Sequence, residues 1–95
     1  MPLTVIATIT AEAGKEEALK PHLIGLVEPT RAEDGCIRYE LHQDNENPTL
    51  FTFNEMWESQ AHLAAHANSE HVAAYRIASK GMAAGFEMRK LTQVI

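Results

Sequence analysis

The stretch EMWESQAHLAAHANSEHVAAY, residues 55–75, carries the chain from the end of a β-strand into alanine-rich helix. Ser59 is a good N-cap because its hydroxyl can accept a hydrogen bond from a free N–H group of the first turn, and its helix is predicted to run to about Ala67. A break in the pattern follows, and Ser69 can cap a second segment that is predicted to run to about Met82. A strand followed by a helix in two pieces therefore anchors the fold prediction.

The residues before this helix predict a strand with two different faces. TLFTFNEMWE, residues 49–58, places Phe51, Phe53, Glu55 and Trp57 on one face and Thr52, Asn54, Met56 and Glu58 on the other. Further upstream, EDGCIRYELHQD begins with a turn at Asp34-Gly35 and continues as a strand. Its alternation directs Ile37, Tyr39 and Leu41 one way and Arg38, Glu40 and His42 the other.

One more helix and two more strands complete the chain. LTVIATITA, residues 3–11, is β-branched and alternates, which predicts the first strand. A helical stripe begins near Lys15, is expected to kink at Pro21 and ends at Pro29. Gly81 and Gly85 are expected to end the second helix, and FEMRKLTQVI, residues 86–95, predicts a final strand.

The predicted order is β-α-β-β-α-β, which is the ferredoxin-like arrangement of an α+β fold with an antiparallel sheet. The whole chain, residues 1–95, is expected to form one domain. Helices can cover one face of such a sheet. The other face would still be apolar, because it carries either the row of Leu3, Val5 and Ile9 or that of Ile6, together with Met56. We therefore expect a homodimer that packs sheet against sheet.

The composition excludes several classes of partner. The formal net charge is −5, from 13 acidic and 8 basic residues, which argues against nucleic acid and against an anionic membrane surface. The single cysteine, Cys36, cannot form an internal disulfide and is interpreted as structural. The first residues lack the positive start of a secretory signal, so a cytoplasmic location is expected.

Histidines are the first candidates for chemistry. His62 and His66 are four residues apart, as are His71 and Tyr75, so each pair shares a helix face. A half-buried imidazole can serve as a base near neutral pH, although these residues could also be core-edge side chains with satisfied polar tips. A more specific alternative for His62 and His66 is a metal site with Glu58 as a third ligand. Solvated surface histidines are the favoured interpretation of this pair.

The aromatic row is the second candidate. Trp57 follows two phenylalanines, Phe51 and Phe53, on the same strand face. Such a row under a helix is usually core, but it can also form the wall of a flat aromatic pocket.

The residues so far described resemble a known family. The segments LTVIATI, AGKEEAL, EPTRAEDGCIRYELHQDNENP, EMWES, HLAAH and EHVAAY are similar to the antibiotic biosynthesis monooxygenase superfamily, and most of all to its small bacterial quinol monooxygenases. The resemblance extends from Leu3 to about Tyr75. It implies a ferredoxin-like protomer that pairs through its sheets into a dimeric α+β barrel.

The resemblance also implies a reaction. Enzymes of this kind oxidise electron-rich phenols or hydroquinones with O2 and use neither metal nor flavin, so no cofactor is expected. Removal of a phenolic proton makes an anion that can give O2 an electron directly, provided that the protein supplies a base and a dry apolar slot. Haem binding is set aside because the first strand has no asparagine and Arg76 stands where the haem-degrading members have their histidine.

The candidate residues and the resemblance together predict a cofactor-independent monooxygenase or oxidase that acts on a quinol or related small phenol. His66 or His71 would be the base, and Tyr75 would orient the substrate hydroxyl. Phe53 and Trp57 would line the pocket, and His42, on the opposite strand face, is a weaker candidate for substrate contact. The alternatives are a small-molecule binder or isomerase on the same dimeric barrel, or a purely structural dimerisation module.

Overall fold

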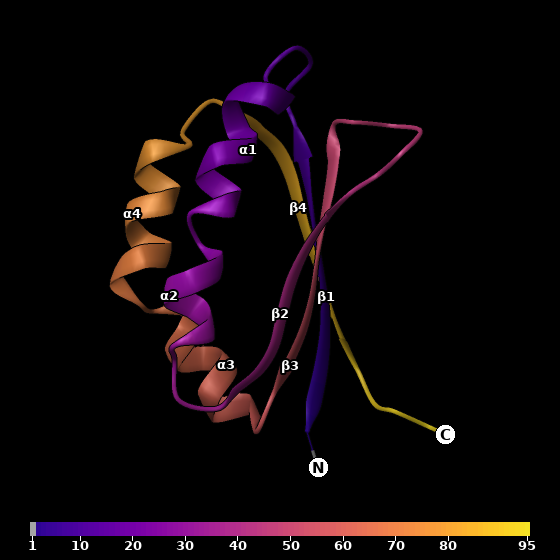
Figure 1. Ribbon diagram of the computed structural model, residues 1–95, viewed down its shortest axis with the longest axis vertical. Helices are drawn as coiled ribbons and strands as arrows, with labels where there is room; N and C mark the ends of the chain where they lie inside the picture. Colours follow the sequence, from indigo (N-terminus) through magenta and orange to yellow (C-terminus); the bar gives the residue numbers. More distant parts are fainter. Residues whose placement is uncertain (1) are drawn as a thin grey trace.

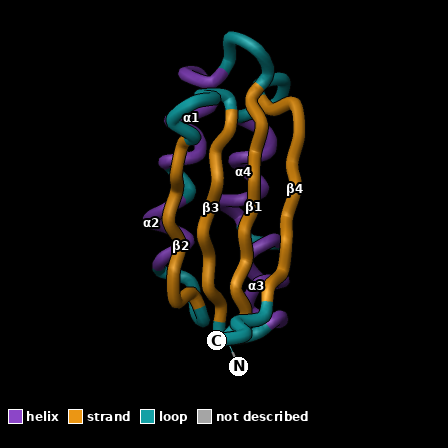
Figure 2. The backbone as a smooth tube through the Cα atoms, turned by 90° about the vertical axis from the view of Figure 1, so that its right-hand side faces the viewer, coloured by secondary structure: helices purple, strands orange, loops and turns teal. Residues whose placement is uncertain are grey.

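Four antiparallel strands form one sheet in the computed structural model, which describes residues 2–95. They are β1 (Leu3–Ala11), β2 (Cys36–Gln43), β3 (Leu50–Trp57) and β4 (Ala83–Leu91). Their order in the sheet is β2-β3-β1-β4, which Figure 2 shows face on. The first strand is thus paired on both sides, with β3 and with β4, while β2 and β4 are the edges.

The helices all lie on one face of this sheet (Figure 1). They are α1 (Glu16–Ile24), α2 (Val27–Arg31), α3 (Gln60–Ala67) and α4 (Glu70–Ala78). The order β-α-β-β-α-β and the ferredoxin-like fold are confirmed, with both helical segments divided into two pieces. Among residues 2–95 no helix is long and apolar enough to cross a membrane.

The core lies between the helices and the sheet. Alternate residues of the two central strands point into it, so their apolar faces meet the apolar stripe of α1. Its most completely buried apolar side chains are Val5, Leu19, Leu23, Phe51 and Trp57. The predicted face of β3, which combines Phe51, Phe53, Glu55 and Trp57, is confirmed as its buried face.

Two predicted helix ends were wrong. Pro29 does not end the first helical segment but lies in the first turn of α2. N–H groups in the first turn have no carbonyl partner within the helix, so a proline there costs no helical hydrogen bond. The last helix ends at Ala78, four residues before the predicted Met82. Gly81 adopts a φ of +85° in the turn that follows, whereas Gly85 belongs to β4, opposite Thr10, next to a shift in register.

The start of β2 is also irregular. Cys36 pairs with Trp57 and Arg38 pairs with Met56, so Ile37 is an additional residue without a partner, as in a β-bulge. The bulge reverses the alternation at this point, and the Ile37 side chain is 51% exposed. The prediction that Ile37 shares a face with Tyr39 was therefore wrong, and Cys36 takes the inward place.

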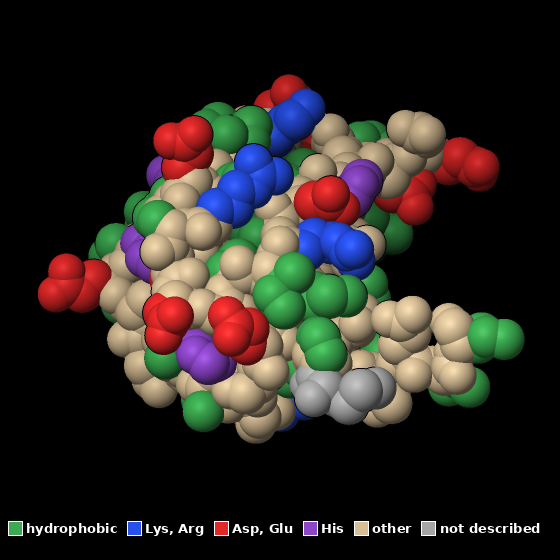
Figure 3. Space-filling view, turned by 60° about the horizontal axis from the view of Figure 1, so that its bottom comes forward, with side chains coloured by type: hydrophobic (Ala, Val, Ile, Leu, Met, Phe, Trp, Pro, Cys, Tyr) green, Lys and Arg blue, Asp and Glu red, His purple; other side chains and the backbone are tan. Residues whose placement is uncertain are grey.

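The far side of the sheet has no helix over it. Every residue of β4 is exposed, and the chain after β4 extends away from the body (Figure 1). Acidic, basic and hydrophobic side chains are interspersed on the face that Figure 3 displays, with no large patch of one charge.

Candidate active site

A cavity of about 570 Å³ lies between the helices and the sheet. Most of its wall is apolar, and the polar groups are few, as is usual for a pocket that binds a small molecule. Its deeper wall includes Ala7, Ile9, Leu23, Leu26, Tyr39, Phe53, Glu55, Leu63, His66, Val72 and Tyr75. Toward β4 the wall includes Arg76, Lys80, Phe86 and Met88, and the last two of these are exposed.

One carboxylate holds two histidines at the side of this cavity. Glu33 lies between α2 and β2, His66 on α3 and His71 at the start of α4. His66 Nδ1 donates a hydrogen bond of 2.6 Å to Glu33 Oε2, and His71 Nε2 donates one of 2.9 Å to the same oxygen. The three side chains are 11–24% exposed, so these contacts are largely shielded from water.

The caps predicted from the sequence explain how the histidines reach this position. The Ser59 hydroxyl accepts a hydrogen bond from the N–H of His62 and the Ser69 hydroxyl accepts one from the N–H of Val72. Between the two helices the N–H of Ser69 donates to the carbonyl of His66, 3.0 Å away. The break therefore turns the chain tightly enough to bring His71 next to His66.

Aromatic rings fix the orientation of His66. Its imidazole lies 4.9 Å from the Trp57 ring and 5.5 Å from the Tyr39 ring, measured between centroids. Tyr39 in turn stacks on Phe53 at 4.6 Å. Nδ1 is bonded to Glu33, so Nε2 is the ring nitrogen that His66, as a residue of the cavity wall, has free for another partner among the described residues.

Glu55 is a buried acid in the same wall. Its residue exposure is only 4%, and Trp57 Nε1 donates a hydrogen bond of 2.9 Å to its Oε1. Burial raises the pKa of Glu55 to about 7, the negative charge of Glu33 adds to the rise, and the bond from Trp57 opposes it. This carboxyl group can therefore gain or lose a proton near neutral pH.

The two tyrosines near the cavity remain protonated. Burial is the main cause that raises the pKa of Tyr39 and of Tyr75. Both phenols are therefore available as hydrogen-bond donors and not as bases. Both tyrosines belong to the cavity wall.

The structure brings together only part of the predicted site. Phe53, His66 and Tyr75 line the cavity. Trp57 does not; it is completely buried beside His66, and its prediction as pocket wall needs correction. His71 also lies outside the cavity wall, with its ring bonded to Glu33.

His42 lies on the other side of the sheet. It pairs with Thr52, whose neighbours Phe51 and Phe53 point toward the helices, so the imidazole of His42 points away from them. The predicted contact between His42 and a substrate is therefore wrong for this cavity, because the sheet separates them. His62 is also elsewhere, with Nδ1 2.8 Å from the Ser59 hydroxyl and Nε2 3.4 Å from Asp34.

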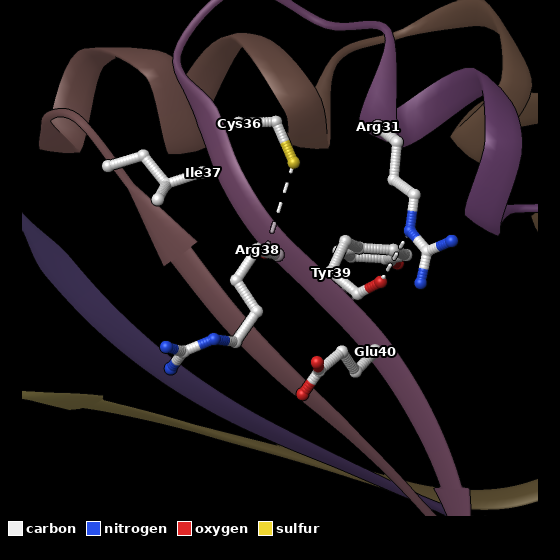
Figure 4. A pocket seen from close by; sticks show the side chains of 6 residues that line it. All are labelled: Arg31, Cys36, Ile37, Arg38, Tyr39 and Glu40. Carbon is white, nitrogen blue, oxygen red and sulfur yellow. Dashed lines mark hydrogen bonds between the residues drawn. The ribbon is translucent and has the colours of Figure 1, made fainter.

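A second, shallower hollow of about 370 Å³ flanks β2 (Figure 4). Arg31 Nε donates to the carbonyl of Tyr39, and the Cys36 thiol donates to the carbonyl of Arg38. Burial raises the pKa of the Cys36 thiol, and the nearby carboxylates Glu33 and Glu55 add to this effect. A thiol that resists ionisation is a poor nucleophile, which agrees with the structural role expected for Cys36.

Two acids of the site, Glu33 and Glu55, were missed by the sequence reasoning. Glu55 had a visible signal, because it is the one charged residue on an otherwise aromatic strand face. Glu33 had no such signal in the sequence. It precedes an ordinary turn, and its partners His66 and His71 are 33 and 38 residues away in the chain. The predicted metal alternative also had the wrong membership, because His66 lies with Glu33 and His71 and not with Glu58.

Comparisons with known proteins agree with this architecture. Residues 2–77 match the family described as "Antibiotic biosynthesis monooxygenase". The chain is 34% identical over 89 residues to the Escherichia coli protein named "Probable quinol monooxygenase YgiN", which covers 83% of this chain and 86% of YgiN.

Solved structures show the same fold over almost the full length. PA3566 from Pseudomonas aeruginosa superimposes with a TM-score of 0.94 at 40% identity, covering 99% of this chain and 95% of that one. Rv0793 from Mycobacterium tuberculosis does so with a TM-score of 0.89 at 27% identity, covering 100% and 97%. The ferredoxin-like fold, the matched residues and these relatives lead to one conclusion: the chain belongs to the antibiotic biosynthesis monooxygenase family.

Proposed function

We propose that this protein uses O2 to oxidise a quinol or a related electron-rich phenol, with His66 as the base that removes the phenolic proton. Membership of a monooxygenase family and similarity to YgiN support the reaction class. The base is supported by the position of His66 in the wall of a largely apolar cavity.

The hydrogen bond between Glu33 and His66 is the observation that carries this proposal. A carboxylate accepts only, so the proton of a neutral His66 ring must sit on Nδ1. Nε2 is then an unprotonated acceptor, as the base of a carboxylate–histidine pair requires. His71 donates to the same oxygen and keeps the carboxylate in place.

The rest of the cavity suits a flat phenol. Phe53 and Leu23 offer apolar contacts to a ring, and Tyr75 can donate a hydrogen bond to a substrate oxygen. Arg76 and Lys80 bring positive charge to the cavity wall, where it would favour the phenolate over the phenol. The apolar part of the wall limits the water that can reach that anion and so keeps it reactive.

The electrons come from the substrate in this scheme. The phenolic proton moves to His66 Nε2, and the anion then reduces O2. If the reaction is a simple oxidation, a hydroquinone and O2 give a quinone and hydrogen peroxide. If one oxygen atom enters the ring, a phenol and O2 give a quinone and water.

We further propose that the protein works as a homodimer that covers the open face of the sheet. Ile6, Met56 and Leu91 lie on that face, among threonines, and no helix of the protomer covers them (Figure 2). Sheet-on-sheet pairing would bury these side chains. Sedimentation at micromolar concentration should then give roughly twice the 10.5 kDa protomer mass, and a monomer that is active at assay concentration would contradict the pairing.

The test of the reaction is oxygen uptake with a panel of hydroquinones and naphthols. His66→Asn should lower the rate by about 10²–10⁴-fold, the usual contribution of a general base. His62→Asn is the matched control, because His62 is on the same helix but bonds to Ser59 and not to Glu33, and its rate should match that of the unaltered protein. Assays of quinone and peroxide separate the two stoichiometries.

Two results would overturn the proposal. Equal loss of rate in the His62 and His66 variants would show that His66 is not the base. Ligand binding without oxygen uptake for every phenol in the panel would favour a binder or isomerase.

A further inference from the structure

Glu33, His66 and His71 also form a set of potential metal ligands. Each offers one ligand atom, and these atoms all lie within 4.8 Å of one another. Glu33 Oε2 is 2.6 Å from His66 Nδ1 and 2.9 Å from His71 Nε2. The three residues come from three separate segments, and the helix caps and ring contacts described above hold two of them. A preformed set of this kind has already met much of the ordering cost that metal binding would otherwise impose.

The surroundings allow an ion to enter and to be held. The side chains of the three residues are 17%, 11% and 24% exposed, so the set lies near the surface without being solvated freely. The hydroxyl oxygen of Thr30, itself fully buried, is 3.1 Å from His71 Nε2 and offers a further oxygen atom. The formal net charge of −5 favours the approach of a cation.

The donor atoms select a class of metal. Two imidazole nitrogens and one carboxylate oxygen suit Zn²⁺, Co²⁺ or Ni²⁺, whereas Mg²⁺ and Ca²⁺ prefer oxygen ligands alone. Three protein ligands also satisfy all but one position of a tetrahedral zinc site. The ion would take the place of the two ring protons that now point at Glu33, and each proton would move to the other nitrogen of its ring.

The location of the set gives such an ion an effect on the base. The ion would occupy Nδ1 of His66, on the side away from the cavity. A neutral imidazole has one N–H, so its proton would move from Nδ1 to Nε2 with no net loss. Nε2 could then no longer accept a proton from a substrate.

From this geometry we propose that Glu33, His66 and His71 form a binding site for a divalent transition-metal ion such as Zn²⁺, which inhibits the enzyme by changing the tautomer of His66. The inhibitory part rests on the proposed function, because it assumes that His66 Nε2 is the base. The binding of a metal ion by the three residues does not depend on the proposed function. The ion is an inhibitor here and takes no part in the oxidation.

Calorimetric titration of the full chain with Zn²⁺ tests the binding site directly. We expect one ion per chain, and no heat from Mg²⁺ under the same conditions. Glu33→Gln and His71→Asn each remove a ligand, so each should weaken Zn²⁺ binding by more than the about 10–100-fold that loss of an outer-shell contact costs. Thermal unfolding and far-ultraviolet circular dichroism establish that each variant is folded.

His62→Asn is again the matched control. His62 has a carboxylate neighbour, Asp34, at 3.4 Å but belongs to no described three-residue set, so its loss should leave Zn²⁺ affinity unchanged. Zinc binding that survives Glu33→Gln and His71→Asn but disappears in His62→Asn would overturn the assignment. Absence of any zinc binding by the unaltered protein would overturn it as well.

Nitrogen-15 nuclear magnetic resonance of the histidine rings tests the tautomer without any substrate. His66 should carry its proton on Nδ1 without metal and on Nε2 with one equivalent of Zn²⁺. Oxygen uptake should fall in proportion to the zinc-bound fraction and recover when a chelator removes the ion. A zinc-induced tautomer change in a protein that oxidises no phenol would contradict only the proposed function, whereas zinc binding without loss of uptake would contradict the inhibition.

Discussion

Replacement of Glu55 by glutamine should make the stability of this protein less dependent on pH. Glutamine has nearly the same shape, and its amide oxygen can accept the hydrogen bond that Trp57 Nε1 now donates to Glu55. The substitution therefore removes the titration of a buried carboxyl group while it preserves its principal contact. Glu33, whose negative charge acts on Glu55, stays in place.

The magnitude follows from the change in pKa on folding. The ordinary pKa of a glutamate is 4.5, and in the folded protein that of Glu55 is raised to about 7. A difference of about 2.5 units, at 1.36 kcal/mol per unit, corresponds to about 3 kcal/mol. The folded state holds the proton more tightly, so the free energy of unfolding falls as pH rises from about 4.5 to about 7. Below this window the carboxyl group is protonated in both states and costs nothing; above it the full penalty applies.

Urea denaturation at a series of pH values measures this effect. Chain concentration must be held constant, because association changes apparent stability. At each pH the free energy of unfolding of the unaltered protein is subtracted from that of Glu55→Gln. This difference should rise by about 3 kcal/mol between about pH 4.5 and pH 7. Glu40→Gln removes a carboxyl group from the exposed side of β2 and serves as the control for a change in charge. A Glu55→Gln difference that stays constant with pH would refute the argument.

Three further substitutions test how the site is held. Gly35→Ala should destabilise the protein by about 1–3 kcal/mol, since φ is +81° and a Cβ would overlap the His62 ring; Gly14→Ala, at φ +80° with open space, is the control, and urea denaturation should show a smaller loss there. Ser59→Ala removes the cap of α3 and should cost about 1 kcal/mol by the same measurement. Phe53→Ala removes a core side chain and should cost about 3–5 kcal/mol, and a loss below 1 kcal/mol would contradict its place in the core.

Regular periodicity accounts for the features that the sequence predicted well. The alternation in β1 and β3 depends only on neighbouring residues, so Phe53 and Trp57 could be placed on the face under the helices without a structure. For β1 the alternation separated the face of Val5 from that of Ile6 but did not tell which of the two is buried. Ser59 and Ser69 were recognisable as caps for the same reason, because a cap acts within one turn. The order of elements then sufficed for the ferredoxin-like topology.

Features that depend on distant residues or on local irregularity were not predictable in this way. The bulge at Ile37 reverses an alternation that looks regular in the sequence. Glu33 acquires its role only when α3 and α4 pack beside the turn in which it lies. Trp57 looked like a pocket wall because strand periodicity gives the face of a residue and not its depth.

The order β2-β3-β1-β4 has a consequence for how the chain is made. During synthesis β1 leaves the ribosome first, yet its two neighbours in the sheet are β3 and β4, and β4 begins only at Ala83. A nascent chain that ends after α4 would leave one edge of β1 unpaired and the cavity without the wall that Phe86 and Met88 supply. Pairing across so long a separation is slow and leaves a strand edge free to join other chains. We therefore expect chains that stall before β4 to aggregate more readily than the complete sheet.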